Sequence, residues 1–166
     1  MYDELTEVDL QKMKEEIAQR IALRPQLIEE VQTARAFGDL SENFEYKCAK
    51  QAKNRNDSRV RYLEGMIRTA KVITPDAQAG TAGLFDRVTL YNELVKREIT
   101  LRIVTTLRQD ALQGLISKES PVGRAILGHR VGDRIWVALE DGSGYFMELR
   151  AIEPGSDDAT LDISAY

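Results

Sequence analysis

Two long segments with apolar residues every three or four positions flank a single glycine, Gly38. This 3,4 spacing is typical of helices that pack along a coiled-coil seam. Because the break at Gly38 is short, the chain has to reverse there, and we expect an antiparallel helical hairpin. Roughly 30 residues per helix would give a rod about 45 Å long. The predicted seam consists of Leu10, Met13, Ile17, Leu27, Val31 and Ala34, facing Ala49, Ala52, Asn56, Arg59, Leu63, Met66 and Ala70.

The middle of this seam is polar. Arg20 and Arg24 occupy seam positions on the first helix, and Asn56 and Arg59 lie at about the same height on the second. We expect a polar layer at this height, and a kink at Pro25, because proline removes a helical hydrogen bond. Three apolar residues are expected to repack around the layer: Ile21, Leu23 and Val60.

Basic residues concentrate in the second helical segment, although the 166-residue chain has a net charge of −4. Residues 47–71 contain eight basic side chains and two acidic ones. At 100° per residue, Lys47, Lys50, Arg61 and Arg68 fall opposite the seam. A local basic face on an acidic protein indicates a directed contact with a polyanion. An ordinary solvated basic face remains the alternative.

The stretch FGDLSEN at the reversal places two carboxylates, Asp39 and Glu42, three residues apart. One interpretation is a capping box, with Asp39 as N-cap, Glu42 reaching back, and Gly38 ending the first helix as a left-handed cap. The other is a pair that helps hold a hard divalent ion such as Mg²⁺. Two carboxylates bind such an ion weakly, so a partner would have to supply the remaining ligands. Both interpretations stay open on these residues alone.

The composition excludes several classes of site. With one cysteine, Cys48, there is neither an internal disulfide framework nor a CxxC or Cys/His cluster for structural zinc. Cys48 lies beside a seam position, where we predict a small packed residue. The stretch MYDELTEVDL is acidic and has no apolar run, which argues against a signal peptide or a membrane span. We therefore expect a cytoplasmic protein.

The chain is expected to divide after a coiled-coil domain at 1–74, whose acidic tip is 38–43. Residues 75–83 (PDAQAGTAG) are interpreted as a linker, and 84–166 as a second domain. Alternating patterns predict strands, with Trp136 in the core, and EDGSG at 140–144 predicts a hairpin turn. Residues 120–128 predict a short helix with Ser120 as N-cap, and His129 is assigned to a loop. The predicted strands are 84–91, 98–106, 134–140 and 145–153, and the polar end of the chain leaves room for an added edge strand.

The stretch ARAFGDLSENFEYKCAKQ resembles the tip signature of the bacterial GreA/GreB transcript cleavage factors. The resemblance extends through RPQLIEEVQTAR, LEGMIRTAKVI and LISKESPVGRAILGHRVGD, covers Leu10 to Ile152, and is closer to GreA. It implies an α+β protein with an N-terminal antiparallel coiled-coil hairpin and a C-terminal FKBP-like domain built on an antiparallel sheet.

Members of this family enter the secondary channel of backtracked bacterial RNA polymerase and stimulate its own cleavage of the nascent RNA 3′ segment. The resemblance therefore implies a factor that is not an enzyme by itself and has no stand-alone cofactor, with Mg²⁺ belonging to the polymerase active site. Asp39 and Glu42 match the acidic tip pair that would help retain this ion. The implied partners are the polymerase channel and its rim and the RNA 3′ segment; we expect no membrane partner, and a monomer.

Further positions match or extend this assignment. Arg35 and Lys50 match basic positions beside the family's tip and are expected to contact RNA phosphate or polymerase, and the helical wheel adds Lys47. Tyr46 and Phe44 could stack on a displaced base, although packing at the end of the hairpin is the stronger expectation for Phe44. The region from Ser120 to Gly128 is a candidate contact of the second domain with the polymerase rim.

Three alternatives remain. A related factor could occupy the channel and inhibit without cleavage, but such a factor should have an altered tip, and both acidic residues are present. A non-catalytic coiled-coil adaptor would not need this acidic tip beside basic residues. A prolyl isomerase is consistent with an FKBP-like domain, yet fold alone does not determine function, and this half of the chain has few aromatic residues for such a pocket.

Overall fold

The computed structural model describes residues 3–38, 42–76 and 78–165. It forms two compact units, Leu10–Ala70 and a second that combines Met1–Asp9 with Lys71–Tyr166. The predicted first domain, 1–74, thus differs from the compact unit at both ends. Residues 3–9 associate with the second half of the chain.

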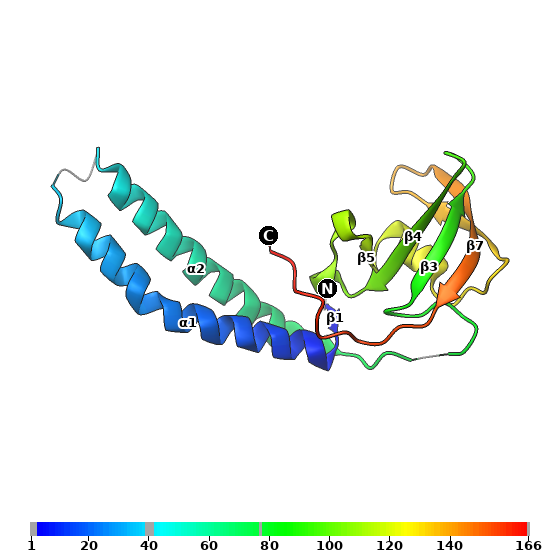
Figure 1. Ribbon diagram of the computed structural model, residues 1–166, viewed down its shortest axis with the longest axis horizontal. Helices are drawn as coiled ribbons and strands as arrows, with labels where there is room; N and C mark the ends of the chain where they lie inside the picture. Colours follow the sequence, from blue (N-terminus) through cyan, green and yellow to red (C-terminus); the bar gives the residue numbers. More distant parts are fainter. Residues whose placement is uncertain (1–2, 39–41, 77, 166) are drawn as a thin grey trace. The chain divides into compact units, whose positions relative to one another are not determined.

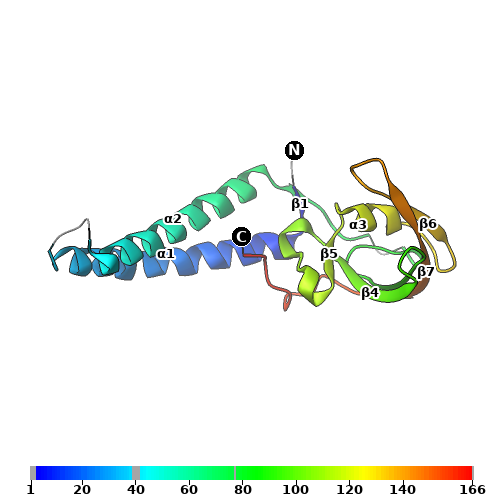
Figure 2. The same cartoon turned by 90° about the horizontal axis from the view of Figure 1, so that it is seen from above.

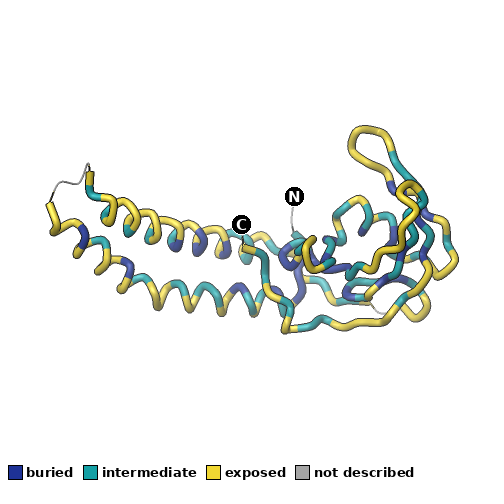
Figure 3. Tube along the Cα trace, turned by 45° about the horizontal axis from the view of Figure 1, so that its top comes forward, coloured by how far each residue is buried: buried dark blue, intermediate teal, exposed yellow. Residues whose placement is uncertain are grey.

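The first unit is a pair of antiparallel helices, α1 (Glu7–Arg35) and α2 (Phe44–Thr69), which lie side by side in Figures 1 and 2. The first turn of α1, up to Asp9, belongs to the other unit. Pro25 lies inside α1, which continues through it. Buried residues recur along the facing sides of the helices (Figure 3) and include Met13, Leu27, Ala34, Val60 and Leu63. The predicted seam is confirmed at most positions, but Ala52 is exposed.

The predicted polar layer is present in the middle of the hairpin. Asn56 and Arg59 are buried on α2. Arg59 donates to both carboxylate oxygens of Glu16, at 2.9 and 3.2 Å, and Asn56 exchanges hydrogen bonds with Arg20. Val60, the next residue along α2, is buried as expected. The expected repacking of Ile21 and Leu23 is wrong, because their side chains are 45% and 41% exposed.

The second unit is built on a five-stranded mixed sheet in the order β5-β4-β3-β7-β6. All pairs are antiparallel except β4 with β5, which the alternating pattern did not predict. A parallel pair, β1 (Glu4–Leu5) with β2 (Lys71–Val72), brings the beginning of the chain to this unit. The five strands are β3 (Arg87–Asn92), β4 (Arg97–Val104), β5 (Leu115–Ser117), β6 (Arg134–Ala138) and β7 (Gly144–Glu153).

Short helices complete this unit. The predicted helix is confirmed as α3 (Pro121–Ile126), with the Ser120 hydroxyl accepting from the Gly123 N–H and proline at the first position. Single 3₁₀ turns, η1 (Thr106–Arg108) and η2 (Ala111–Gln113), connect β4 to β5. The expected turn between β6 and β7 is also present, with a positive φ at Gly142. No strand forms in the described part of the tail beyond Glu153, so the expected extra edge strand is wrong.

The core of the second unit lies where α3 packs against the sheet. Ile126 of α3 joins Val88, Leu90, Ile135 and other apolar strand residues in one buried cluster. The prediction that Trp136 belongs to this core is wrong, because its side chain is 50% exposed. In β6 the buried residues are Ile135 and Val137, so alternation places Trp136 on the opposite face. There the Trp136 and Phe146 rings pack edge to face, with their centroids 4.8 Å apart.

No helix in the described part of the chain is both long enough and apolar enough to cross a membrane.

Candidate functional site

The candidate site is the end of the hairpin, where the chain passes from α1 to α2. After α1 ends, Phe37 donates its backbone N–H to Ala34 at 3.2 Å, and Gly38 adopts a φ of +114°. This positive φ confirms that a glycine is needed after the first helix. Asp39 lies outside the described residues. Glu42 is exposed in the turn that precedes α2.

The start of α2 is fixed by Asn43. Its side-chain oxygen accepts from the Tyr46 N–H at 3.0 Å, and its amide nitrogen donates to the Ala34 carbonyl of α1 at 2.7 Å. The predicted capping box is therefore wrong, because α2 begins at Phe44 and Glu42 precedes the cap. The Glu42 carboxylate lies outside the helix. The stretch FGDLSEN contains several residues that favour N-cap positions, which is why the sequence did not identify Asn43 as the cap.

Three predicted residues form a cluster where the two helices meet. The Arg35 guanidinium carbon lies 5.7 Å from the centre of the Tyr46 ring, and the Lys50 Nζ lies 5.9 Å from the same centre. A hydrogen bond from Arg35, together with the charges of Lys50 and Arg35, lowers the pKa of the Tyr46 hydroxyl below its ordinary value. Two cations therefore lie near one aromatic ring.

The remaining predicted tip residues are exposed and lie in the first two turns of α2. Lys47 follows Tyr46 on α2, and its backbone N–H donates to Asn43 at 3.1 Å. Phe44 is 75% exposed, so the expectation that it packs at the end of the hairpin is wrong. Cys48 is also exposed, contrary to the predicted packed residue. Farther along α2, Arg61 and Arg68 are exposed as the helical wheel predicted.

The chemistry of this site combines carboxylate oxygen with clustered cations. Glu42 offers an exposed carboxylate next to a helix start, and Arg35, Tyr46 and Lys50 offer donors for phosphate oxygens. Among the described residues, no group of three or more His, Cys, Asp or Glu side chains could hold a metal ion.

In the second unit, the candidate docking region from Ser120 to Gly128 contains α3, whose Arg124 is 64% exposed and pairs with Glu119. His129 follows it in a loop, as predicted, with its Nδ1 3.0 Å from an Asp133 carboxylate oxygen. These contacts account for the local structure, and the docking role of this region stays a prediction.

Comparison with known proteins agrees with the two-part organisation. The family described as "Transcription elongation factor, N-terminal" matches residues 4–72, and that described as "Transcription elongation factor, GreA/GreB, C-term" matches residues 77–154. The protein "Transcription elongation factor GreA" of Sinorhizobium medicae is 42% identical over 133 residues, covering 80% of this chain and 84% of the relative. The protein of the same name from Thermoanaerobacter pseudethanolicus is 37% identical, covering 90% and 94%.

A structural comparison gives a crystal structure of GreA factor homolog 1 of Thermus thermophilus, with a TM-score of 0.42 and 24% identity, covering 93% of this chain and 100% of that one. The family assignment rests on the sequence matches, which extend over both units. The chain belongs to the GreA/GreB family of transcription elongation factors.

Proposed function

We propose that this protein inserts the tip of its hairpin into the secondary channel of backtracked bacterial RNA polymerase and stimulates cleavage of the nascent RNA 3′ end. The family assignment supports the polymerase as partner. The single observation that carries the cleavage role is the position of Glu42. Glu42 is exposed in the turn immediately before the capped start of α2, and Tyr46 and Lys50 of the cationic cluster lie in the first two turns of that helix.

In this proposal the reaction belongs to the polymerase, and the chain supplies ligands and charges. Carboxylate oxygens are the ligands that Mg²⁺ prefers, and Asp39 and Glu42 together fall short of a full coordination set. They would therefore share an ion with the polymerase active site. Such an ion activates water and stabilises the leaving oxygen in phosphodiester cleavage.

The cationic cluster has a separate role in this proposal. Arg35 and Lys50 would contact a phosphate of the extruded RNA, and Lys47 adds positive charge on the same helix. Tyr46 lies near both cations and is partly exposed, so it would contact the RNA or the channel wall together with them. These contacts would position the RNA, while the carboxylates act near the scissile phosphate.

The test is RNA release from purified backtracked elongation complexes in the presence of Mg²⁺. We expect Asp39→Asn and Glu42→Gln each to reduce stimulated cleavage by about 10–100-fold, as loss of a group that tunes a metal site does. Glu64→Gln is a control, because Glu64 is another exposed glutamate, which lies inside α2 near the end of the helix that is far from the tip. It should leave cleavage unchanged.

Two results would contradict the proposal. If the Asp39 and Glu42 variants release RNA as fast as the wild type, the tip carboxylates have no part in the chemistry. If the wild type binds the polymerase without releasing any fragment, the protein is a channel-occupying regulator that does not stimulate cleavage.

A further inference from the structure

A groove lies between α1 and α2 near the hairpin end, on a different face from the Arg35–Tyr46–Lys50 cluster. Its volume is about 360 Å³, within the usual size range of ligand pockets. Arg35 follows the groove residue Thr33 by two positions, which turns it by about 200° around α1. The lining residues are Gln26, Glu29, Glu30, Thr33, Ala34 and Phe37 of α1 and the adjoining turn, with Glu45 and Ala49 of α2.

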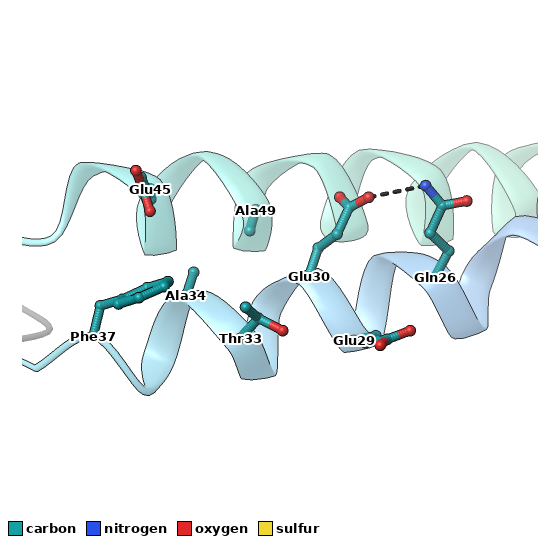
Figure 4. Close-up of a pocket in the computed structure, with 8 residues that line it drawn as sticks. All are labelled: Gln26, Glu29, Glu30, Thr33, Ala34, Phe37, Glu45 and Ala49. Atoms are coloured by element: carbon teal, nitrogen blue, oxygen red, sulfur yellow. Dashed lines mark hydrogen bonds between the residues drawn. The ribbon is translucent and has the colours of Figure 1, made fainter.

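The groove combines an apolar surface with negative charge. Figure 4 shows the Phe37 ring beside Ala34 at one end and Glu30 reaching from α1 towards α2. Ala34 is buried, whereas Phe37 is 72% exposed. Glu30 accepts a hydrogen bond from Gln26 at 3.0 Å (Figure 4), and Glu45 approaches from α2. An exposed aromatic ring next to carboxylates is a surface on which an arginine or lysine stem packs while its charge is neutralised.

The charges of the groove are not neutralised within the described chain. Among residues 3–38, 42–76 and 78–165, neither Lys nor Arg forms an ion pair with Glu29, Glu30 or Glu45. This contrasts with the middle of the hairpin, where Glu16 and Asp57 both pair with cations. The carboxylates therefore leave a negative field at the groove, which favours a positively charged partner.

The same charges decide between kinds of partner. RNA is a polyanion, so these carboxylates repel it, and the tip offers it the cationic cluster on another face. A metal ion alone is disfavoured, because no group of described acidic, cysteine or histidine side chains is arranged to hold one. A protein segment with an arginine or lysine fits both the apolar surface and the charge.

We propose that this groove docks a basic segment of RNA polymerase, with one arginine or lysine stem against Phe37 and its positive charge attracted by the carboxylates of Glu30 and Glu45. The inference rests on the proposed function for the identity of the partner. The hairpin would then have two binding surfaces near its end. The cationic cluster would bind RNA, and the anionic groove would bind the protein wall of the channel.

Binding to purified elongation complexes tests this proposal, measured separately from cleavage at saturating factor. The double variant Glu30→Gln/Glu45→Gln retains the size of both side chains and removes their charge. We expect it to bind roughly three- to thirtyfold more weakly at low salt, with the difference shrinking as salt rises. Cleavage at saturation should stay at the wild-type rate, because Asp39 and Glu42 are intact.

A matched control is available on the same helix. Glu15 accepts a hydrogen bond from Gln11 four residues earlier at 2.9 Å, the same arrangement as Glu30 with Gln26, and it is exposed outside the groove. Glu15→Gln should therefore bind like the wild type. Equal binding of the double variant and the wild type at every salt concentration would overturn the docking proposal.

Crosslinking identifies what occupies the groove. In a Cys48→Ser background, Thr33→Cys can carry a photoreactive group, because Thr33 is an exposed residue of the groove and Cys48 is the chain's single cysteine. A crosslink to an arginine- or lysine-containing polymerase peptide supports the proposal, and a crosslink to RNA alone overturns it.

The two proposals can fail separately. A wild type that binds and crosslinks but does not stimulate cleavage refutes only the proposed function. A wild type that does not bind polymerase refutes both.

Discussion

At the scale of single residues, Asn43 connects the two helices at the tip through one amide group. Its oxygen caps α2 and its nitrogen holds the last turn of α1. Sequence patterns identified the surroundings of this residue, including the exposed Lys50 and the glycine at 38. They did not identify Asn43, because the choice among neighbouring N-cap residues depends on where the helix begins, and that is set by a hydrogen bond to α1.

Substitutions at Asn43 should separate its two hydrogen bonds. Asn43→Ala loses both, and we expect a loss of about 1–2 kcal/mol in the stability of the hairpin. Asn43→Ser retains an oxygen suited to an N-cap but has no amide to reach Ala34, so it should lose about half as much. Urea unfolding of the full chain, followed by far-UV circular dichroism, measures both. Equal effects of the two substitutions would mean that the bond to Ala34 contributes nothing.

At the scale of secondary-structure elements, alternation and heptad spacing predicted both long helices, the polar layer and four strands of the sheet. The errors arose where the sequence pattern does not determine which face of a strand is buried or which strand pairs with which. Trp136 alternates correctly within β6, but the exposed face was taken for the buried one. The strand β5 was missed because its three residues pair in parallel with β4, a contact that no local pattern encodes.

The polar layer predicts how the stability of the hairpin depends on pH. Burial raises the pKa of Glu16, but hydrogen bonds from Arg59 and Arg20 outweigh this and lower it overall. Hydrogen bonds from Lys53 and Arg24 likewise lower the pKa of Asp57. A carboxylate whose pKa is lower in the folded state stabilises the fold above its unfolded pKa. This stabilisation is lost as the pH falls through the folded pKa.

The expected result is a fall in melting temperature on acidification below about pH 4.5, steeper in the wild type than in Glu16→Gln. Thermal unfolding of the full chain, monitored by its helical signal, gives both curves. Because the glutamine cannot ionise, the variant lacks the contribution of this one carboxyl group. Parallel curves for the two proteins would show that the Arg59 pair does not favour the ionised form of Glu16.

The close packing of α3 can be tested by comparing substitutions at two helical glycines, Gly123 of α3 and Gly65 of α2. An added Cβ at Gly123 would lie 2.2 Å from the Ser117 carbonyl oxygen, whereas at Gly65 of α2 it would meet nothing within 4 Å. Alanine favours a helix over glycine by about 1 kcal/mol. We expect Gly65→Ala to stabilise its unit by up to that amount and Gly123→Ala to destabilise its unit by about 1–3 kcal/mol. Chemical denaturation distinguishes them, and stabilisation by Gly123→Ala would contradict the close approach.

At the scale of the whole molecule, distant parts of the chain meet at Arg108. Its side chain is fully buried and forms an ion pair with Asp9, with Nε 2.7 Å from Oδ1. It also pairs with Asp157, donates to the Asp158 carbonyl at 3.0 Å, and lies over the Phe85 ring. These contacts join the first turn of α1 and the tail to the second unit. The sequence could not predict them, because the partners are separated by up to about a hundred residues and share no periodic pattern.

The buried Asp9–Arg108 ion pair predicts how much stability is lost when either residue, or both, is replaced. Removing one partner leaves the other charge buried and uncompensated, which costs about 3–5 kcal/mol. We therefore expect Asp9→Leu and Arg108→Met each to destabilise the second unit by about that amount. The double variant leaves no unpaired charge between them, so its loss should be smaller than the sum of the two single losses.

A double-mutant cycle from urea unfolding of the full chain measures this coupling. The tail carboxylate of Asp157 is partly accessible to water, with 16% of its side chain exposed, so it can be solvated when Arg108 is replaced. A coupling free energy of at least about 1 kcal/mol would show that this buried pair holds residues 3–9 on the second unit. Additive losses would instead mean that Thr6, Phe85 and the apolar neighbours hold the segment, with the two charges contributing independently.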